Sequence, residues 1–267
     1  MSGSPPLSTG GDPMKEFLVL LKRDLLLIKM HCRKRMLMVL FVSAALNLLY
    51  CVIGEPELVR RSLIGVDAFS LAENPGIFPV HWILLQLSGV FILYDFVRTD
   101  FYEHACGILV RLEKRKRFGQ SKFAAGMCVC LVMALLHGCV YAGTGLLWTQ
   151  MAEGKNAGLR ISLYLMSSVF LFMGMTIACS IFQTVSLWLN EGIGVAAAIC
   201  VLCAGMTGVS PWFPVNQVMP VRSRMLDLSG DVCFWQSAAG FGVLLACLLV
   251  CMSVFVSTAD VYGKEGE

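Results

Sequence analysis

The stretch ISLYLMSSVFLFMGMTIACSIFQTVSLWL, residues Ile161–Leu189, contains no charged side chain and no proline. An α-helix rises 1.5 Å per residue, so about 20 apolar residues cross a bilayer core of roughly 30 Å. Five more runs are mainly apolar and of suitable length: Met36–Gly54, Ile77–Asp95, Phe123–Trp148, Gly192–Val209 and Ser237–Val256. The pattern predicts an all-α membrane protein in which residues 14–267 form one domain with six transmembrane helices.

The composition and the placement of charge agree with this class. Hydrophobic residues make up 57% of the chain and charged residues 15%, whereas a soluble domain has about 25% charged residues. Only eight charged residues lie between Phe123 and Ala259, and none of them is at the middle of an apolar run. A charge at the bilayer centre costs roughly 2.5–3.5 kcal/mol or more, so this distribution favours membrane insertion.

Basic residues gather in two blocks, seven before the first run and seven between the second and third runs. The positive-inside rule then predicts that both termini lie in the cytoplasm, which an even number of spans also requires. The blocks are flanked by apolar runs and lack interleaved aromatic residues for base stacking. Nucleic acid is therefore not an expected partner, and the lipid bilayer is.

The N-terminal region divides into two parts. Residues 1–13, MSGSPPLSTGGDP, are small, polar and turn-prone, which predicts a disordered tail. Residues Met14–Arg35 predict an amphipathic helix at the cytoplasmic interface, with a simple extension of the first transmembrane helix as the alternative. Its apolar positions recur at helical spacing: Phe17, Leu18, Leu21, Leu25 and Ile28.

Two connections between the apolar runs are distinctive. The cytoplasmic segment Arg98–Lys122 reads RTDFYEHACGILVRLEKRKRFGQSK, and its apolar residues predict a short helix ahead of a dense basic stretch. Two interpretations stay open for it: a helix that transmits force from a partner, and a solvated loop that sets orientation. Between the fourth and fifth runs only Asn190 and Glu191 interrupt the apolar sequence, which predicts a tight helical hairpin.

The segment Ser210–Gln236 is a third distinctive connection, on the predicted outer side. Its prolines, Pro211, Pro214 and Pro220, prevent a continuous helix. Trp212 and Phe213 suit a membrane interface. The segment is either an outer gate or cap, partly re-entrant into the outer leaflet, or an interfacial anchor.

The groups of a catalytic or metal centre are not found in a recognisable arrangement. Most cysteines fall within apolar runs, where they behave as small packing residues, and the four histidines have no metal-ligand spacing. No G-x-x-x-x-G-K-[ST] phosphate loop is present, so any ATP-driven work needs a separate ATPase chain. We therefore expect no catalytic residue, no metal and no cofactor in this chain.

Four polar side chains lie inside the predicted spans: Asn47, Gln86, His137 and Gln183. An ionisable group such as His137 in that position is a candidate functional residue. The alternative for all four is hydrogen bonding between neighbouring helices.

The layout resembles the membrane-spanning permease subunit of an ABC-type exporter, of the six-span class found in bacteriocin or lantibiotic immunity and multidrug export. MKEFLVLLKRDLLLIK is similar to the connecting helix before the first span of that class. The residues from Glu103 to Gly107 resemble its E-x-x-x-G pattern, Ser121-Lys122-Phe123 the opening of its third span, and Ser210–Leu228 its external re-entrant helices. A departure is the RLEKRKR stretch, where the family often has a Pro-Ser/Thr-Arg turn.

The resemblance implies a bacterial-type plasma membrane protein that pairs with a second permease copy or paralogue. Each permease would hold one ABC ATPase subunit, which binds ATP, on its cytoplasmic side. The ATPase-coupling segment would include Arg98, Phe101, Tyr102, Glu103, Gly107, Leu109 and Arg111. The cargo would be an amphipathic peptide, drug or lipid-like molecule, handled mainly by spans one, two and five. The alternatives are a membrane scaffold without transport and, further from the pattern, a membrane-embedded enzyme.

Overall fold

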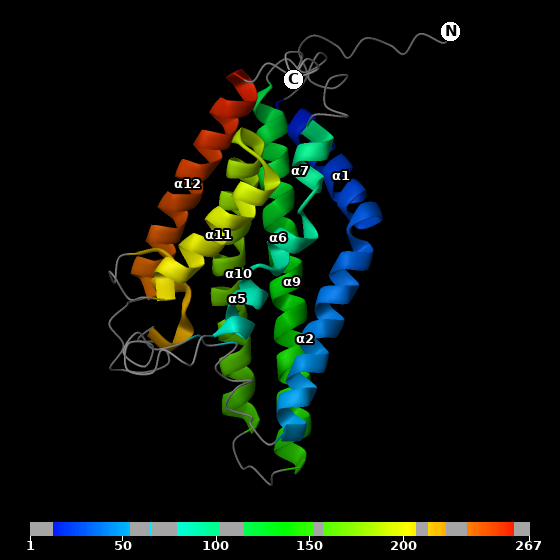
Figure 1. Cartoon of the computed structure of the whole chain (residues 1–267), viewed down its shortest axis with the longest axis vertical. Helices are drawn as coiled ribbons and strands as arrows, with labels where there is room; N and C mark the ends of the chain where they lie inside the picture. Colours follow the sequence, from blue (N-terminus) through cyan, green and yellow to red (C-terminus); the bar gives the residue numbers. More distant parts are fainter. Residues whose placement is uncertain are drawn as a thin grey trace.

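The computed structural model describes residues 13–53, 63, 65, 79–101, 115–151, 157–206, 213–222 and 234–258. All of the regular structure within these ranges is helical. Four helices among the described residues are long and apolar enough to cross a membrane: Arg33–Ile53, Lys116–Thr144, Met166–Trp188 and Trp235–Thr258. The chain thus has the helices of a membrane protein, and Figure 1 shows the long helices running side by side along the longest axis of the molecule.

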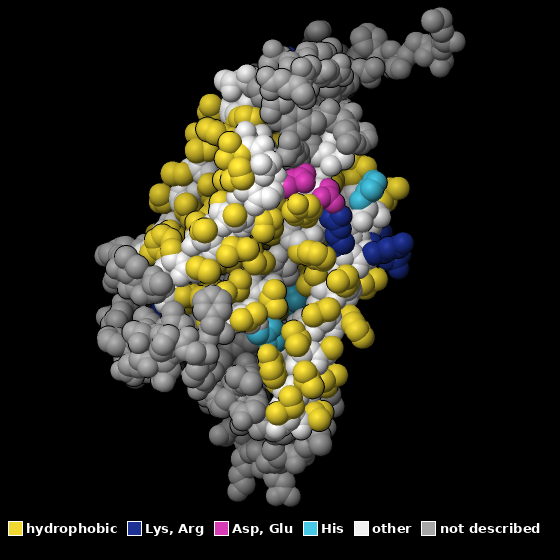
Figure 2. All heavy atoms as spheres, viewed as in Figure 1, with side chains coloured by type: hydrophobic (Ala, Val, Ile, Leu, Met, Phe, Trp, Pro, Cys, Tyr) yellow, Lys and Arg dark blue, Asp and Glu magenta, His cyan; other side chains and the backbone are white. Residues whose placement is uncertain are grey.

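Helix α10 (Ala157–Trp188) is the centre of the bundle. It packs against α9 (Lys116–Met151), α11 (Glu191–Met206) and α12 (Phe234–Thr258). In its apolar window 78% of the residues are buried, against 11% in the windows of α12 and of α2 (Arg33–Ile53). The outer helices therefore present apolar side chains to their surroundings, and Figure 2 shows hydrophobic side chains spread over most of the described part of one face. Such a surface suits lipid.

The hairpin predicted around Asn190 is confirmed. Helix α10 ends at Trp188, α11 begins at Glu191, and the two helices pack against each other in opposite directions (Figure 1). The side-chain oxygen of Asn190 accepts a hydrogen bond of 2.8 Å from the backbone N–H of Ile193. This is an N-cap, which satisfies one of the free donors at the start of α11.

The second apolar run does not form one helix. It contains α5 (Val80–Gln86) and α6 (Ser88–Ile92), and α7 (Phe96–Thr99) follows it directly. The hydroxyl of Ser88 donates to the carbonyl of Leu85 at 2.7 Å, an alternative to the regular helical ladder. Backbone hydrogen bonds still bridge the α5–α6 junction, whereas the backbone turns at Leu93–Asp95 before α7.

The predicted N-terminal helix is present as α1 (Pro13–His31), so it begins inside the expected tail. Its buried positions are Leu20, Asp24 and Ile28, spaced by one helical turn. Two residues of the expected apolar stripe, Leu18 and Leu25, are exposed and not packed into the bundle. A single turn residue separates α1 from α2, and Figure 1 shows the two helices following one another with a bend between them.

Polar side chains inside the bundle pack onto glycines of neighbouring helices. The Gln86 side chain lies directly against Gly174 of α10, and the Gln183 side chain of α10 lies against Gly126 of α9. Both amides are buried. Small residues at such contacts let helices approach closely, so these two glutamines belong to helix packing.

Candidate functional site

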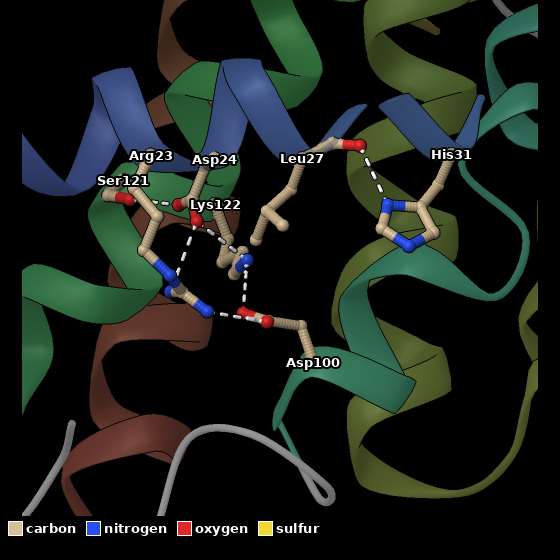
Figure 3. Close-up of polar contacts among 7 residues, drawn as sticks. All are labelled: Arg23, Asp24, Leu27, His31, Asp100, Ser121 and Lys122. Carbon is tan, nitrogen blue, oxygen red and sulfur yellow. Dashed lines mark hydrogen bonds and ion pairs between the residues drawn. The ribbon is translucent and has the colours of Figure 1, made fainter. Parts of the chain in front are cut away.

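A network of charged residues lies where α1 crosses the first turns of α9 (Figure 3). The Lys122 ammonium donates a hydrogen bond of 2.8 Å to Asp24 Oδ1 and lies 2.5 Å from Asp100 Oδ2. Arg23 Nη2 donates to Asp100 Oδ1 at 2.6 Å and its Nη1 lies 3.4 Å from Asp24. The hydroxyl of Ser121 donates to the other oxygen of Asp24. We call these five residues the charge network.

The charge network is electrically balanced, and all of it except the partly exposed Arg23 is deeply buried. The side chains of Asp24 and Lys122 are 0% exposed, and that of Asp100 is 7% exposed. Two carboxylates face two cationic groups, so no net charge is left in the low-dielectric interior. The Lys122 ammonium also lies 4.2 Å from the centroid of the Phe96 ring, where the aromatic face attracts a cation.

The charge network joins three segments that are far apart in sequence. Asp24 lies on α1, Lys122 lies near the start of α9, and Asp100 follows α7. Asp100 and the buried Phe101 lie at the start of the proposed coupling segment. The Phe101 ring packs against the Phe118 ring of α9, with 6.1 Å between the centroids. The residues after α7 therefore contact α9 at two places, Lys122 and Phe118.

The expected coupling residues are only partly within the described chain. Phe101 is placed as above, and Arg98 belongs to α7, although its side chain is outside the description. The others lie outside the described residues: Tyr102, Glu103, Gly107, Leu109 and Arg111. The structure thus describes only the start of the segment, up to Phe101.

Two further ion pairs lie near the same end of the bundle. Arg117 of α9 pairs with Glu16 of α1, and Arg35 of α2 pairs with Asp95 before α7. The basic blocks that set the predicted orientation therefore have two roles. Some members form ion pairs, and others are exposed: Lys15, Lys22, Lys29, Arg33, Lys34, Arg115 and Lys116.

The proposed outer gate is described at residues 213–222, and Pro211 and Trp212 lie outside the described residues. Two short 3₁₀ helices, η2 (Asn216–Val218) and η3 (Pro220–Arg222), follow Phe213 and Pro214, and Pro220 is buried. Val215, Val218 and Met219 are buried in the same hydrophobic cluster as Trp82 and Met206.

Arg222 fixes this outer segment to the end of α11. Its Nη1 donates to the Gly205 carbonyl at 2.8 Å and its Nη2 donates to the Met206 carbonyl at 3.0 Å. Nη1 also donates to the side-chain oxygen of Asn216. The last carbonyls of an α-helix have no partner within the helix, so the guanidinium acts as a C-terminal cap.

A groove of about 460 Å³ lies between α2, α5, α6, α9 and α11. Its walls are mainly apolar, and its polar side chains include Ser43, His81 and His137. His81 Nε2 lies 3.3 Å from the Tyr141 hydroxyl. In Figure 2, histidine atoms are visible in the middle of the hydrophobic face. Sequence reasoning singled out His137 but did not bring it together with Ser43 and His81.

No group of three His, Cys, Asp or Glu side chains able to hold a metal occurs in the described residues. The groove and the charge network are therefore the two features that a function has to explain. The chain matches no protein-family model, no curated protein and no solved structure.

Proposed function

We propose that this chain is the membrane-spanning subunit of an ATP-driven ABC exporter in a bacterial-type plasma membrane. It would have six transmembrane segments, cytoplasmic termini, an interfacial N-terminal helix and an outer re-entrant segment. It would work as a pair with a second permease, and each permease would hold one ATPase subunit. The observation that carries the proposal is the position of the charge network, which ties Asp100 to α1 and α9.

The proposed route of force begins at the ATPase. ATP-driven closure of the ATPase subunits would displace the coupling segment, which includes Glu103 and Gly107. The displacement would reach Asp100 first, and from there α9 through Lys122 and α1 through Arg23, since both ion pairs are short, the first buried and the second part-buried. Paired buried charges resist separation, so they suit the transmission of a displacement between helices.

Two shorter elements complete the proposed count of six spans. Residues 80–99 would cover about 30 Å if α5, α6 and α7 were in line, which is the thickness of a bilayer core. Helix α11 has 16 residues and covers about 24 Å, and the capped outer segment at its end would fill the remainder. The groove adds support, because its walls come mainly from α2, α5 and α6, which correspond to spans one and two, and Val195 of α11 adds one residue of span five.

The test is purification of the full chain in mild detergent, followed by mass spectrometry of bound proteins. We expect a stoichiometric ATPase subunit with a phosphate loop, lost on Glu103→Arg or Gly107→Trp. Glu57→Arg, the same charge reversal on the predicted outer side, should keep it. A chain that purifies without any ATPase, or an ATPase retained equally by all three variants, would refute the proposal.

A further inference from the structure

The groove between α2 and α9 carries polar groups that have no partner in the folded chain. The hydroxyl of Ser43 and both ring nitrogens of His137 are buried without a hydrogen bond, and both residues line the groove. His81 Nδ1 is also without a partner. Buried polar atoms are nearly always hydrogen-bonded in folded proteins, so this group of atoms points to a ligand.

Asn47 extends the same polar group along α2. It lies one turn after Ser43, its side chain is 0% exposed, and neither its oxygen nor its nitrogen has a hydrogen bond. Gln86 Oε1 and Gln183 Nε2 also lack a hydrogen bond, but both amides pack on glycines of facing helices and neither residue lines the groove. His137 lines the groove and Asn47 adjoins it, and every side-chain nitrogen and oxygen of these two residues lacks a hydrogen bond.

The side chains that line the groove indicate the charge of the ligand that it can bind. The described lining of the groove holds no Asp, Glu, Lys or Arg, so neither a cation nor an anion would find an opposite charge there. A neutral imidazole donates from one nitrogen and accepts at the other, and a hydroxyl does both. The matching head group is neutral and carries both donors and acceptors, as an alcohol does.

The apolar walls of the groove indicate the chemistry of the part of the ligand beyond its head group. The groove opens between side chains that are exposed on the apolar surface, among them Met38, Val42, Leu84 and Phe91. A hydrocarbon chain can lie along such walls, and it can enter sideways from the bilayer without crossing water. A volume of about 460 Å³ suits one molecule of drug or lipid size.

We propose that this groove binds one neutral, single-chain lipid with a hydroxyl head group, of the monoacylglycerol type. The hydroxyls would hydrogen-bond to His137 and Ser43, and the acyl chain would lie along the apolar wall toward Phe91. Binding itself does not depend on the ATP-driven transport proposed above. If that proposal holds, this lipid class is the expected cargo class.

The experiment uses the full chain in detergent and a monoacylglycerol with a photoactivatable diazirine in its acyl chain. We expect cross-links on peptides of α2, α5 and α6. Unlabelled monoacylglycerol should compete at least tenfold better than a lysophosphatidate or an alkylammonium of the same chain length. Equal competition by the charged lipids, or cross-links spread over α12, would overturn the proposal.

Two variants and two controls locate the head group. His137→Leu and Ser43→Ala should each raise the apparent Kd about tenfold, whereas Leu135→Ala and Ser257→Ala, on exposed side chains of α9 and α12, should leave it unchanged. Replacing unpartnered polar groups by apolar ones should not harm folding. Should either variant still misfold, Val42→Trp, which blocks the groove from its exposed wall, must abolish cross-linking, and persistence of cross-linking refutes the site.

The outcomes separate this inference from the proposed function. Lipid binding without a co-purified ATPase would support the groove and refute the exporter. A co-purified ATPase without selective lipid binding would do the reverse.

Discussion

The ammonium of Lys122 lies 2.8 Å from a carboxylate oxygen of Asp24, although 98 positions separate the two residues in the chain. Both side chains are 0% exposed. A buried ion pair adds little net stability, but the loss of one partner leaves an uncompensated charge in the interior. Lys122 is therefore the residue on which the packing of α1 against α9 depends most.

Lys122→Met should destabilise the chain by about 3–5 kcal/mol, because it leaves Asp24 and Asp100 facing each other with only the part-exposed Arg23 as a cation. Thermal unfolding in detergent measures this. Lys116→Met, one and a half turns earlier on the exposed surface of α9, should change stability by no more than about 0.5 kcal/mol. The double variant Lys122→Met/Asp24→Asn should recover part of the loss. Equal melting of the two lysine variants would contradict the role of the charge network.

Asp100→Asn tests the proposed route of force. The amide keeps the size of the side chain but weakens the ion pairs with Lys122 and Arg23. If the chain is an exporter subunit, the ATPase should stay bound while cargo-stimulated ATP hydrolysis falls several-fold. Export and ATPase assays on reconstituted vesicles would show this, and hydrolysis at the wild-type rate would argue against transmission through Asp100.

Gly174→Ala should destabilise the bundle by about 1–3 kcal/mol, because an added Cβ would run into the side chain of Gln86. Gly143 provides the matched control on α9, since nothing lies within 4 Å of a Cβ added there. Gly143→Ala should be neutral or stabilising, as alanine is the better helix former. Denaturation in graded detergent ranks the two variants, and the reverse order would show that the Gln86 contact is not tight.

Arg222→Met should loosen the end of α11, because it leaves the Gly205 and Met206 carbonyls without their cap. The expected loss is about 1–3 kcal/mol. Hydrogen exchange of α11 should rise at its last turn and stay unchanged at its Asn190-capped start. Arg222→Lys keeps the charge but not the planar fork, so it should lie between the wild type and Arg222→Met. Unchanged exchange in both variants would rule out the cap.

Cys32, at the junction of α1 and α2, should react slowly with a water-soluble maleimide. Burial raises the pKa of its thiol and the Asp95 carboxylate raises it further, against the opposing effect of Arg35. The thiolate that reacts is then scarce at neutral pH, and its rate should keep rising above the usual pKa range of a free thiol. Asp95→Asn removes the negative charge, so the pKa should fall and the reaction should quicken.

A single-cysteine background with Cys32 alone gives the rate profile against pH. A cysteine placed at the exposed position 29 serves as the reference. If Cys32 follows the same profile as that reference, its thiol is not buried.

The long apolar runs could be predicted from sequence because helix length and hydropathy are local properties. Runs one, three, four and six correspond to long apolar helices, and the Asn190 hairpin follows from two residues. The break after the second run depends on the turn at Leu93–Asp95, which residue type alone does not reveal. The remaining expectations about six spans, topology and coupling stay predictions.

The charge network could not be predicted from local sequence patterns. Lys122 is one basic residue among many near the start of the third run, and only its distant partners explain its burial. One signal was available: Asp24 is the only acidic residue between Glu16 and Glu55, and it falls on the same helical face as Leu20 and Ile28. A lone carboxylate on a buried face requires a cation from elsewhere in the fold.

The distance in sequence between Asp24 and Lys122 also has a consequence for biogenesis. A ribosome adding roughly 5–20 residues per second completes Lys122 about 5–20 s after Asp24. During that interval the N-terminal helix has a carboxylate with no internal cation from α9, and it has to wait at the membrane surface while two apolar runs are inserted. Helix α1 therefore cannot reach its final position until the start of α9 has been made, and a chain truncated before α9 would leave α1 undocked.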